Sequence, residues 1–98
     1  MPVLAKVHET VEARILACCD SELVGKTLKH GKINFNVSER FYKGEAIKEQ
    51  ELEELLKEFE NINLVGEQTI AIAIKSGIID EKSVIRIGKV PHAQIFKV

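Results

Sequence analysis

This sequence has few of the features that would place a protein in a specialised class. Its only two cysteines, Cys18 and Cys19, are adjacent, and neighbours in a strand point to opposite faces, so no disulfide framework is expected. The chain has no HxH, HxxxH or CxxC spacing, so we predict neither a metal site nor a cofactor. No apolar run approaches the roughly 20 residues that a membrane-spanning helix needs. We therefore expect no membrane among the partners of this protein. The first residues lack the apolar region of a secretory signal, so we expect a cytoplasmic protein.

A chain of 98 residues allows one domain, residues 1–98, since a second core would have too little material. Hydrophobic residues make up 45% of the chain and charged residues 30%, which predicts a packed core under a well-solvated surface. The formal net charge of −1 is unevenly distributed. Residues 49–60 contain six glutamates and one lysine, a balance of −5, so the remainder of the chain carries +4.

Apolar residues predict strands in the first third of the chain. We expect strands at 3–8 and 14–19, and the second is apolar on both faces, which is typical of a central strand. Residues 20–25 fit a single helical turn with a capping residue at its start and a glycine at its end. A hairpin follows, with strands at 27–30 and 33–37 and a glycine in its turn.

The most regular helical pattern lies in the acidic segment. Four apolar residues recur at helical spacing and form one stripe: Leu52, Leu55, Leu56 and Phe59. This stripe predicts a helix over 49–60 with its glutamates facing solvent. The preceding segment, 38–46, is typical of an irregular connection.

A second, buried helix is predicted over 63–77, with Asn63 as its cap and Gly77 near its end. Three alternating isoleucines in this segment also fit a strand, but the alanines between them favour a helix. Strands at 84–87 and 93–98, joined by GKVPH, complete the chain. The order of strands, two helices and strands predicts an α+β fold with a mixed or mainly antiparallel sheet and two helices on one side.

Nucleophilic catalysis would require a reactive thiol. Cys18 or Cys19 could pair with one of the three histidines, but both cysteines lie in a strand predicted to be buried, where thiols behave as small hydrophobes. The glutamates of the 49–60 helix could supply acid or base chemistry, yet such a run opposite a leucine stripe is usually a solvated face. We therefore predict no catalytic residue in either segment.

A phosphate could bind at the start of the second predicted helix. Gly66 and Glu67 lie in its first turn, where backbone N–H groups are free. Glu67 would repel an anion, however, and a single glycine is a weak signal. The alternative is that Gly66 allows a neighbouring strand to pack closely.

Basic residues gather on the predicted hairpin and just after it: Lys26, Lys29, Lys32 and Arg40. Lysine and arginine neutralise phosphates, and Tyr42 or Phe41, if exposed, could stack on a base, so this segment is the best candidate for contact with RNA. The alternative is that the lysines protect a strand edge against pairing with other chains.

The segment RIGKVPHAQI contains the other candidate site. Pro91 makes the entry to the last strand rigid. His92 and Gln94 then lie on one strand face, two residues apart. Both side chains can donate and accept hydrogen bonds, so they could recognise a ligand or satisfy a buried backbone group equally well.

Four segments, CDSELVGKTL, FYKGE, NLVGE and RIGKVPHAQI, resemble the motifs of a small archaeal family known as domain of unknown function 424. The resemblance covers nearly the whole chain and implies a cytoplasmic, single-domain α+β protein associated with translation. It brings no established enzymatic activity. The adjacent pair Cys18 and Cys19 departs from the family pattern. The matching residues are Asp20, Gly25, Lys26, Tyr42, Gly44, Asn63, Gly66, Glu67, Gly88, Pro91, His92, Ala93 and Gln94.

Three functions follow from these features. The first is a non-enzymatic module that binds RNA or a ribonucleoprotein through the basic segment, with Asn63, His92 and Gln94 forming a polar pocket. The second is a small enzyme in which His92 acts as acid and base with Glu67 as its partner. The third is a module that binds a partner protein through the acidic helix 49–60.

Overall fold

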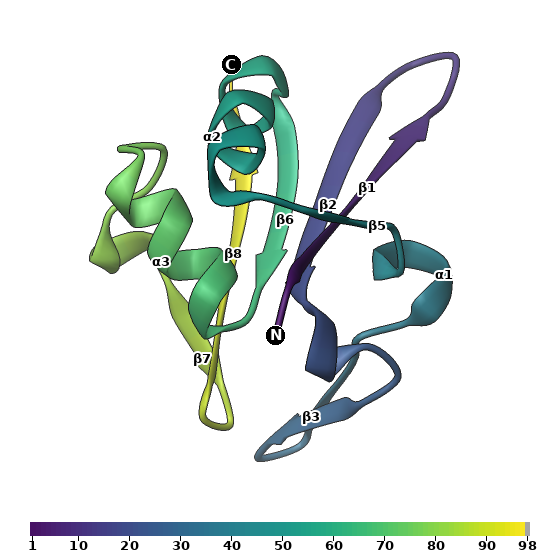
Figure 1. The fold of residues 1–98 in the computed structure, drawn as a ribbon. Helices are drawn as coiled ribbons and strands as arrows, with labels where there is room; N and C mark the ends of the chain where they lie inside the picture. Colours follow the sequence, from purple (N-terminus) through teal and green to yellow (C-terminus); the bar gives the residue numbers. More distant parts are fainter. Residues whose placement is uncertain (98) are drawn as a thin grey trace.

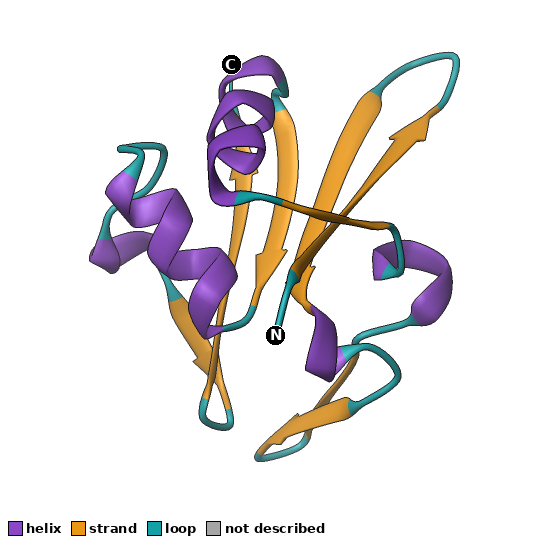
Figure 2. Ribbon diagram, in the orientation of Figure 1, coloured by secondary structure: helices purple, strands orange, loops and turns teal. Residues whose placement is uncertain are grey.

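The computed structural model describes residues 1–97, which form one six-stranded sheet, one two-stranded hairpin and three α-helices (Figures 1 and 2). The strands are β1 (Val3–Glu9), β2 (Arg14–Asp20), β3 (Thr27–His30), β4 (Ile33–Asn36), β5 (Glu45–Ile47), β6 (Asn61–Val65), β7 (Ile85–Ile87) and β8 (Val90–Phe96). The helices are α1 (Glu39–Tyr42), α2 (Glu49–Glu58) and α3 (Glu67–Lys75), with 3₁₀ turns η1 (Ser21–Leu23) and η2 (Glu81–Ser83). In this part of the chain, no helix combines the length and apolarity needed to cross a membrane.

The large sheet has the strand order β5–β1–β2–β6–β8–β7. β2 and β6 are parallel, and all the other neighbouring pairs are antiparallel. The sheet is therefore mixed, as predicted. β2 lies in the interior of the sheet and its last five residues, 16–20, are buried, which confirms the prediction of a central strand.

Each face of the sheet has its own apolar core. On one face, Leu52 and Leu56 of α2 and Ile70 of α3 pack against sheet residues such as Leu16 and Leu64. On the other face, the β3–β4 hairpin and α1 contribute apolar side chains. Figure 1 shows both elements across the sheet from α3. The α+β fold with two helices on one side is confirmed, and the short α1 lies on the opposite side.

The second predicted helix begins later than expected. Asn63 belongs to β6 and is not a helix cap, because residues 61–65 follow the two-residue period of a strand, with Ile62 and Leu64 facing the helices. Pairing with β2 on one side and β8 on the other fixes this period. Only residues 67–75 of the predicted helix are helical, and they form α3, with Gly66 at the N-cap position.

Two further segments differ from the sequence prediction. Residues 38–46, expected to be irregular, contain α1 and the edge strand β5, and the Ser38 side chain caps α1 by accepting a hydrogen bond from the Phe41 N–H. The turn before β8 consists only of Gly88 and Lys89, and the strand already begins at Val90. Gly88 has a positive φ of 67° at the first turn position, which is typical of a type II′ hairpin.

Candidate functional site

The basic segment lies on the face of the sheet opposite α2. Residues 24–43 contain five basic side chains and one acidic side chain, Glu39, which gives a net charge of +4. Lys26, Lys29, Lys32 and Arg40 are all exposed. Leu28 of the hairpin points inward to the core, so the alternating Lys29 side chain points outward. The structure therefore brings all four predicted basic residues to one side of the molecule.

Strand pairing arranges the sheet side chains on this same face into three cross-strand rows. The hairpin row is Leu4, Cys19, Val65 and His92. The middle row is Lys6, Ala17, Asn63 and Gln94. The loop row is His8, Ile15, Asn61 and Phe96. The face thus changes from a largely buried row under the hairpin to two rows of mixed polarity away from it, in which Gln94 and Phe96 are exposed.

The middle row brings together two of the predicted polar residues. Asn63 of β6 and Gln94 of β8 are direct cross-strand partners, and Gln94 is exposed. Within residues 1–97, neither side-chain amide makes a hydrogen bond, so both retain their donors and acceptors. Lys6 lies in the same row, and its Nζ donates to the Arg40 carbonyl oxygen at 2.7 Å. Sequence reasoning missed Lys6, although the alternation within β1 places it on this face.

His92 is enclosed beneath the hairpin and does not line an open pocket with Gln94. Only 9% of its surface is exposed, and its ring meets the edge of Phe35 at a centroid distance of 5.0 Å. Its Nδ1 atom is buried and has no hydrogen-bond partner within residues 1–97. Burial lowers the pKa of His92 below its usual value because the charged imidazolium loses hydration. Burial thus favours the neutral imidazole over the imidazolium.

Tyr42 does not fit the predicted role of stacking on a base. Its side chain is only 3% exposed and packs in the core between Phe35 and Phe41. Burial raises the pKa of the Tyr42 hydroxyl. The half-buried Phe41 ring instead stacks on His8 at 4.6 Å. The sequence pattern gave no way to distinguish these adjacent aromatics, because both lie in the segment predicted to be irregular.

The start of α3 is occupied by a carboxylate from the protein itself. The buried Asp20 side chain accepts hydrogen bonds from the backbone N–H groups of Gln68 and Thr69, at 3.0 and 2.9 Å. It also accepts one from the Thr69 hydroxyl at 2.8 Å. A phosphate cannot use these donors while Asp20 holds them. Asp20 precedes η1, but its side chain caps α3 and not that 3₁₀ turn.

Gly66 allows the Asp20 carboxyl group to approach the backbone at the start of α3. Its φ is +115°, and a side-chain carbon at this position would overlap the Asp20 carboxyl group. Its N–H donates to the Pro91 carbonyl oxygen of β8 at 3.0 Å. The packing role for Gly66 therefore fits the structure better than anion binding.

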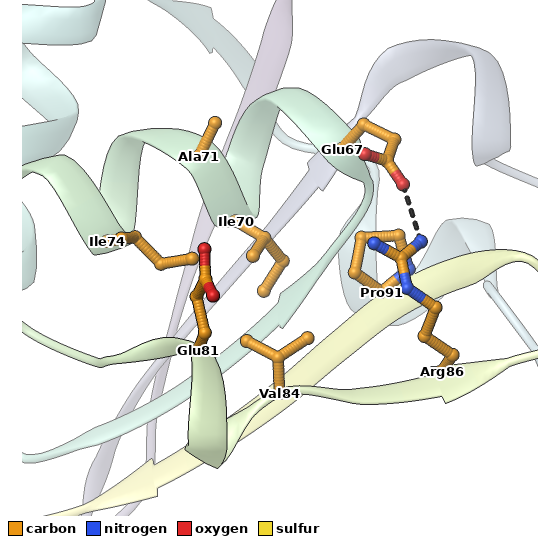
Figure 3. A pocket seen from close by; sticks show the side chains of 8 residues that line it. All are labelled: Glu67, Ile70, Ala71, Ile74, Glu81, Val84, Arg86 and Pro91. Carbon is orange, nitrogen blue, oxygen red and sulfur yellow. Dashed lines mark hydrogen bonds and ion pairs between the residues drawn. The ribbon is translucent and has the colours of Figure 1, made fainter.

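Glu67 and His92 lie on opposite faces of the sheet. Glu67 lines a cavity of about 390 Å³ between α3 and β7, where it forms an ion pair with Arg86 at 2.8 Å (Figure 3). Pro91 lines the same cavity, so the next residue of β8, His92, points to the other side. The structure does not bring together the proposed acid–base pair.

The cysteines are buried and unreactive. Desolvation raises the pKa of Cys18 and of Cys19 to about 12, so the thiolate is scarce at neutral pH. In residues 1–97, no three histidine, cysteine, aspartate or glutamate side chains lie close enough together to hold a metal ion. The glutamates of α2 remain mostly exposed on the side of the sheet away from the hairpin.

Comparison with known proteins agrees with this fold. Residues 8–98 match the family described as "Protein of unknown function (DUF424)". A crystal structure of an uncharacterized conserved protein from the archaeon Methanopyrus kandleri is similar, with a TM-score of 0.82 and 29% sequence identity. The alignment covers 100% of this chain and 95% of that one. No functionally curated protein matches the chain.

Proposed function

The chain belongs to this family of unknown function, and we propose that it is a non-enzymatic module that binds single-stranded RNA on the hairpin side of its sheet. The observation that carries the proposal is the net charge of +4 within residues 24–43, on the face where Gln94 of the middle row is exposed. In this proposal the protein works in the cytoplasm, with RNA of the translation machinery, as the family resemblance implies.

Phosphate contacts would come from the exposed lysines of the hairpin. Lys26, Lys29 and Lys32 form no ion pair within residues 1–97, so their charges are available to a nucleic-acid backbone. Arg40 follows in α1 on the same side. Such contacts release counterions and give an affinity that falls steeply as salt rises.

Base contacts would come from the middle row. Side-chain amides can bond to the hydrogen-bonding edges of bases, and the Asn63 and Gln94 amides have no partners within residues 1–97. Those base edges are accessible in a single strand but are occupied in a duplex. This favours unpaired RNA over double-stranded RNA.

The geometry gives less support to an enzyme. His92 is enclosed and its pKa is lowered, Glu67 is paired with Arg86 on the other face, and both thiols have a raised pKa. An acid or base needs to reach a substrate proton at hydrogen-bond distance. The exposed residues of the hairpin side have charge and amide groups suited to binding.

The test is a titration of single-stranded RNA, about 20 nucleotides long and of mixed sequence, followed by fluorescence anisotropy between about 50 and 200 mM salt. The variant Lys26→Gln/Lys29→Gln/Lys32→Gln removes three charges from the hairpin. If each lysine contacts one phosphate, the slope of log affinity against log salt falls by about 2, since each contact in a single strand contributes about 0.7.

A matched control removes three lysines from the helix side, Lys48→Gln/Lys57→Gln/Lys82→Gln, and changes the net charge equally. This control should keep nearly all of the affinity. Equal losses in both variants would show that only net charge matters. Absence of binding at the lowest salt would overturn the proposal.

A further inference from the structure

A second surface lies at the end of the sheet away from the hairpin. It is a groove of about 480 Å³ lined by the loop 10–13, Arg14, residues 58–61 and Phe96. In Figure 1 the β1–β2 loop and the end of α2 both lie at the end of the molecule opposite the β3–β4 hairpin. We call this surface the loop-end groove.

The charge of the loop-end groove is negative. Three carboxylates line it, those of Glu12, Glu58 and Glu60, against the single cation Arg14. Arg14 is already engaged, because its Nε lies 3.4 Å from a carboxylate oxygen of Glu9, which is outside the lining. Within residues 1–97, none of the three lining carboxylates forms an ion pair. The groove therefore favours a cationic ligand.

Apolar surface accompanies this charge. The Phe96 side chain is 73% exposed, and Val11 at the tip of the loop is fully exposed. Both residues line the groove. Water solvates isolated carboxylates well but solvates exposed rings and branched side chains poorly, so the combination suits a cation attached to an apolar segment.

One hydrogen-bond acceptor in the groove is unused. The Asn61 Oδ1 atom is enclosed and has no donor within residues 1–97. Asn61 and Phe96 are direct cross-strand partners, so this acceptor lies beside the exposed ring. This atom has almost no accessible surface, so a ligand bound in the groove does not reach it, and recognition must come from the exposed ring and the carboxylates.

The groove already contains one contact between a guanidinium group and an aromatic ring. The Arg14 guanidinium carbon lies 4.5 Å from the centroid of the Phe59 ring. A guanidinium is planar, stacks on aromatic rings and carries five N–H donors in a fixed arrangement. A second guanidinium could stack on the exposed Phe96 ring and lie near the glutamates.

We propose that the loop-end groove binds an arginine side chain, flanked by apolar residues, from an extended segment of a partner protein. The arginine stacks on Phe96 near the lining glutamates, and an apolar neighbour covers Val11. This site does not depend on the RNA-binding proposal, because it uses different residues at the other end of the sheet. It assigns a specific ligand chemistry to the end of the acidic segment 49–60.

The test uses three peptides that differ at one position: acetyl-Gly-Leu-Arg-Leu-Gly-amide and the same peptide with citrulline or lysine in place of arginine. Citrulline has nearly the shape of arginine without its charge. Titration of the full chain, followed by NMR amide shifts, should show the arginine peptide perturbing residues 10–14, 58–61 and 96. The citrulline peptide should bind about tenfold more weakly, and the lysine peptide should fall between them. Equal binding of all three peptides, or shifts centred elsewhere, would overturn the proposal.

Variants at exposed positions separate the contributions without threatening the fold. Phe96→Leu keeps apolar surface but removes the ring, and Glu58→Gln/Glu60→Gln removes two charges. Each should weaken the arginine peptide by several-fold to about tenfold. Glu45→Gln/Glu54→Gln, two exposed glutamates outside the lining, and Ile85→Leu, an exposed apolar residue of β7, are the matched controls and should bind normally.

Two other occupants have distinct signatures. If the groove binds a second copy of the chain, sedimentation will show concentration-dependent association that Glu58→Gln/Glu60→Gln abolishes. If the groove belongs to the RNA surface, Phe96→Leu will weaken RNA binding and the peptides will not shift groove resonances. Either result would overturn assignment of the groove to a partner protein.

Discussion

At the hairpin end of the sheet, the hairpin row is sealed by Leu28 and Phe35, and its last member, His92, is 9% exposed. At the other end of the same two strands, the loop row finishes in Phe96, which is 73% exposed. The covering segment 24–43 carries +4, whereas the loop-end groove contains three carboxylates and one engaged arginine. The two ends thus differ in cover and in sign of charge.

The change from polar to apolar residues along β6 follows the edge of the segment that covers this face of the sheet. On β6, the residues of this face run from Asn61 through Asn63 to Val65, and only Val65 lies under the hairpin. An asparagine in a central strand costs stability unless it is bonded or solvated. The asparagines therefore lie beyond the hairpin's cover, and their cross-strand partners Gln94 and Phe96 are exposed to ligands.

The largest expected effect is at the buried cap of α3. Asp20→Ala removes three hydrogen bonds to a buried carboxylate and leaves two backbone N–H groups without a partner. We expect the free energy of unfolding to fall by about 3 kcal/mol, because bonds to charged groups and helix caps each contribute about 1 to 2 kcal/mol. Urea unfolding followed by circular dichroism measures this.

The matched variant is Asp80→Ala. Asp80 also accepts from two backbone N–H groups, those of Lys82 and Ser83, but it is exposed at the start of the short η2. Water can replace its bonds, so the loss should be about 1 kcal/mol or less. If both substitutions lowered the free energy of unfolding equally, burial of the Asp20 carboxylate would not explain its contribution to stability.

The next prediction compares the phenylalanines at the two ends. Phe35→Ala removes the ring that covers His92, and the free energy of unfolding should fall by about 2 kcal/mol, less than for a fully buried phenylalanine because Phe35 is half-buried. Phe96→Ala should cost under about 0.5 kcal/mol, since that ring is mostly exposed. Thermal unfolding of both variants under the same conditions measures the two losses. A larger loss for Phe96→Ala than for Phe35→Ala would contradict the prediction.

Much of this fold follows from local patterns. The apolar stripe of α2 and the alternation in the hairpin each have a clear period, whereas β2 is a short apolar run, and the structure confirms the helix, the hairpin and the interior place of β2. The resemblance to the family is confirmed as well. Apolar spacing predicted these segments because most of the apolar side chains that the spacing places on one face pack in the core.

The errors come from interactions between distant residues. Asn63 was predicted to cap a helix, because nothing nearby shows that β2 pairs with residues 61–65. The cap of α3 is Asp20, 48 residues before Gln68, and no local pattern could identify it. The separation of Glu67 from His92 likewise depends on which face of β8 points to α3.

The candidate sites divide in the same way. The exposure of the hairpin lysines could be predicted, since charged residues in a short hairpin face solvent. The pairing of Asn63 with Gln94 and of Asn61 with Phe96 depends on the register between β6 and β8. A shift of one residue would turn these side chains to the helix face, so the structure was needed to locate both the middle row and the loop-end groove.

The smallest predicted effect tests the enclosure of His92 by pH. Burial lowers its pKa in the folded protein from a usual value near 6.5, so the unfolded chain takes up a proton first as the pH falls. The free energy of unfolding is therefore highest above about pH 6.5 and decreases as the pH falls through that value toward the lower folded pKa. His92→Phe should remove this component and, because it also removes the unpartnered Nδ1, should not lose stability at neutral pH. An NMR titration of the His92 ring checks the cause directly: a pKa at or above 6.5 in the folded protein would mean that the hairpin does not seal this end of the sheet.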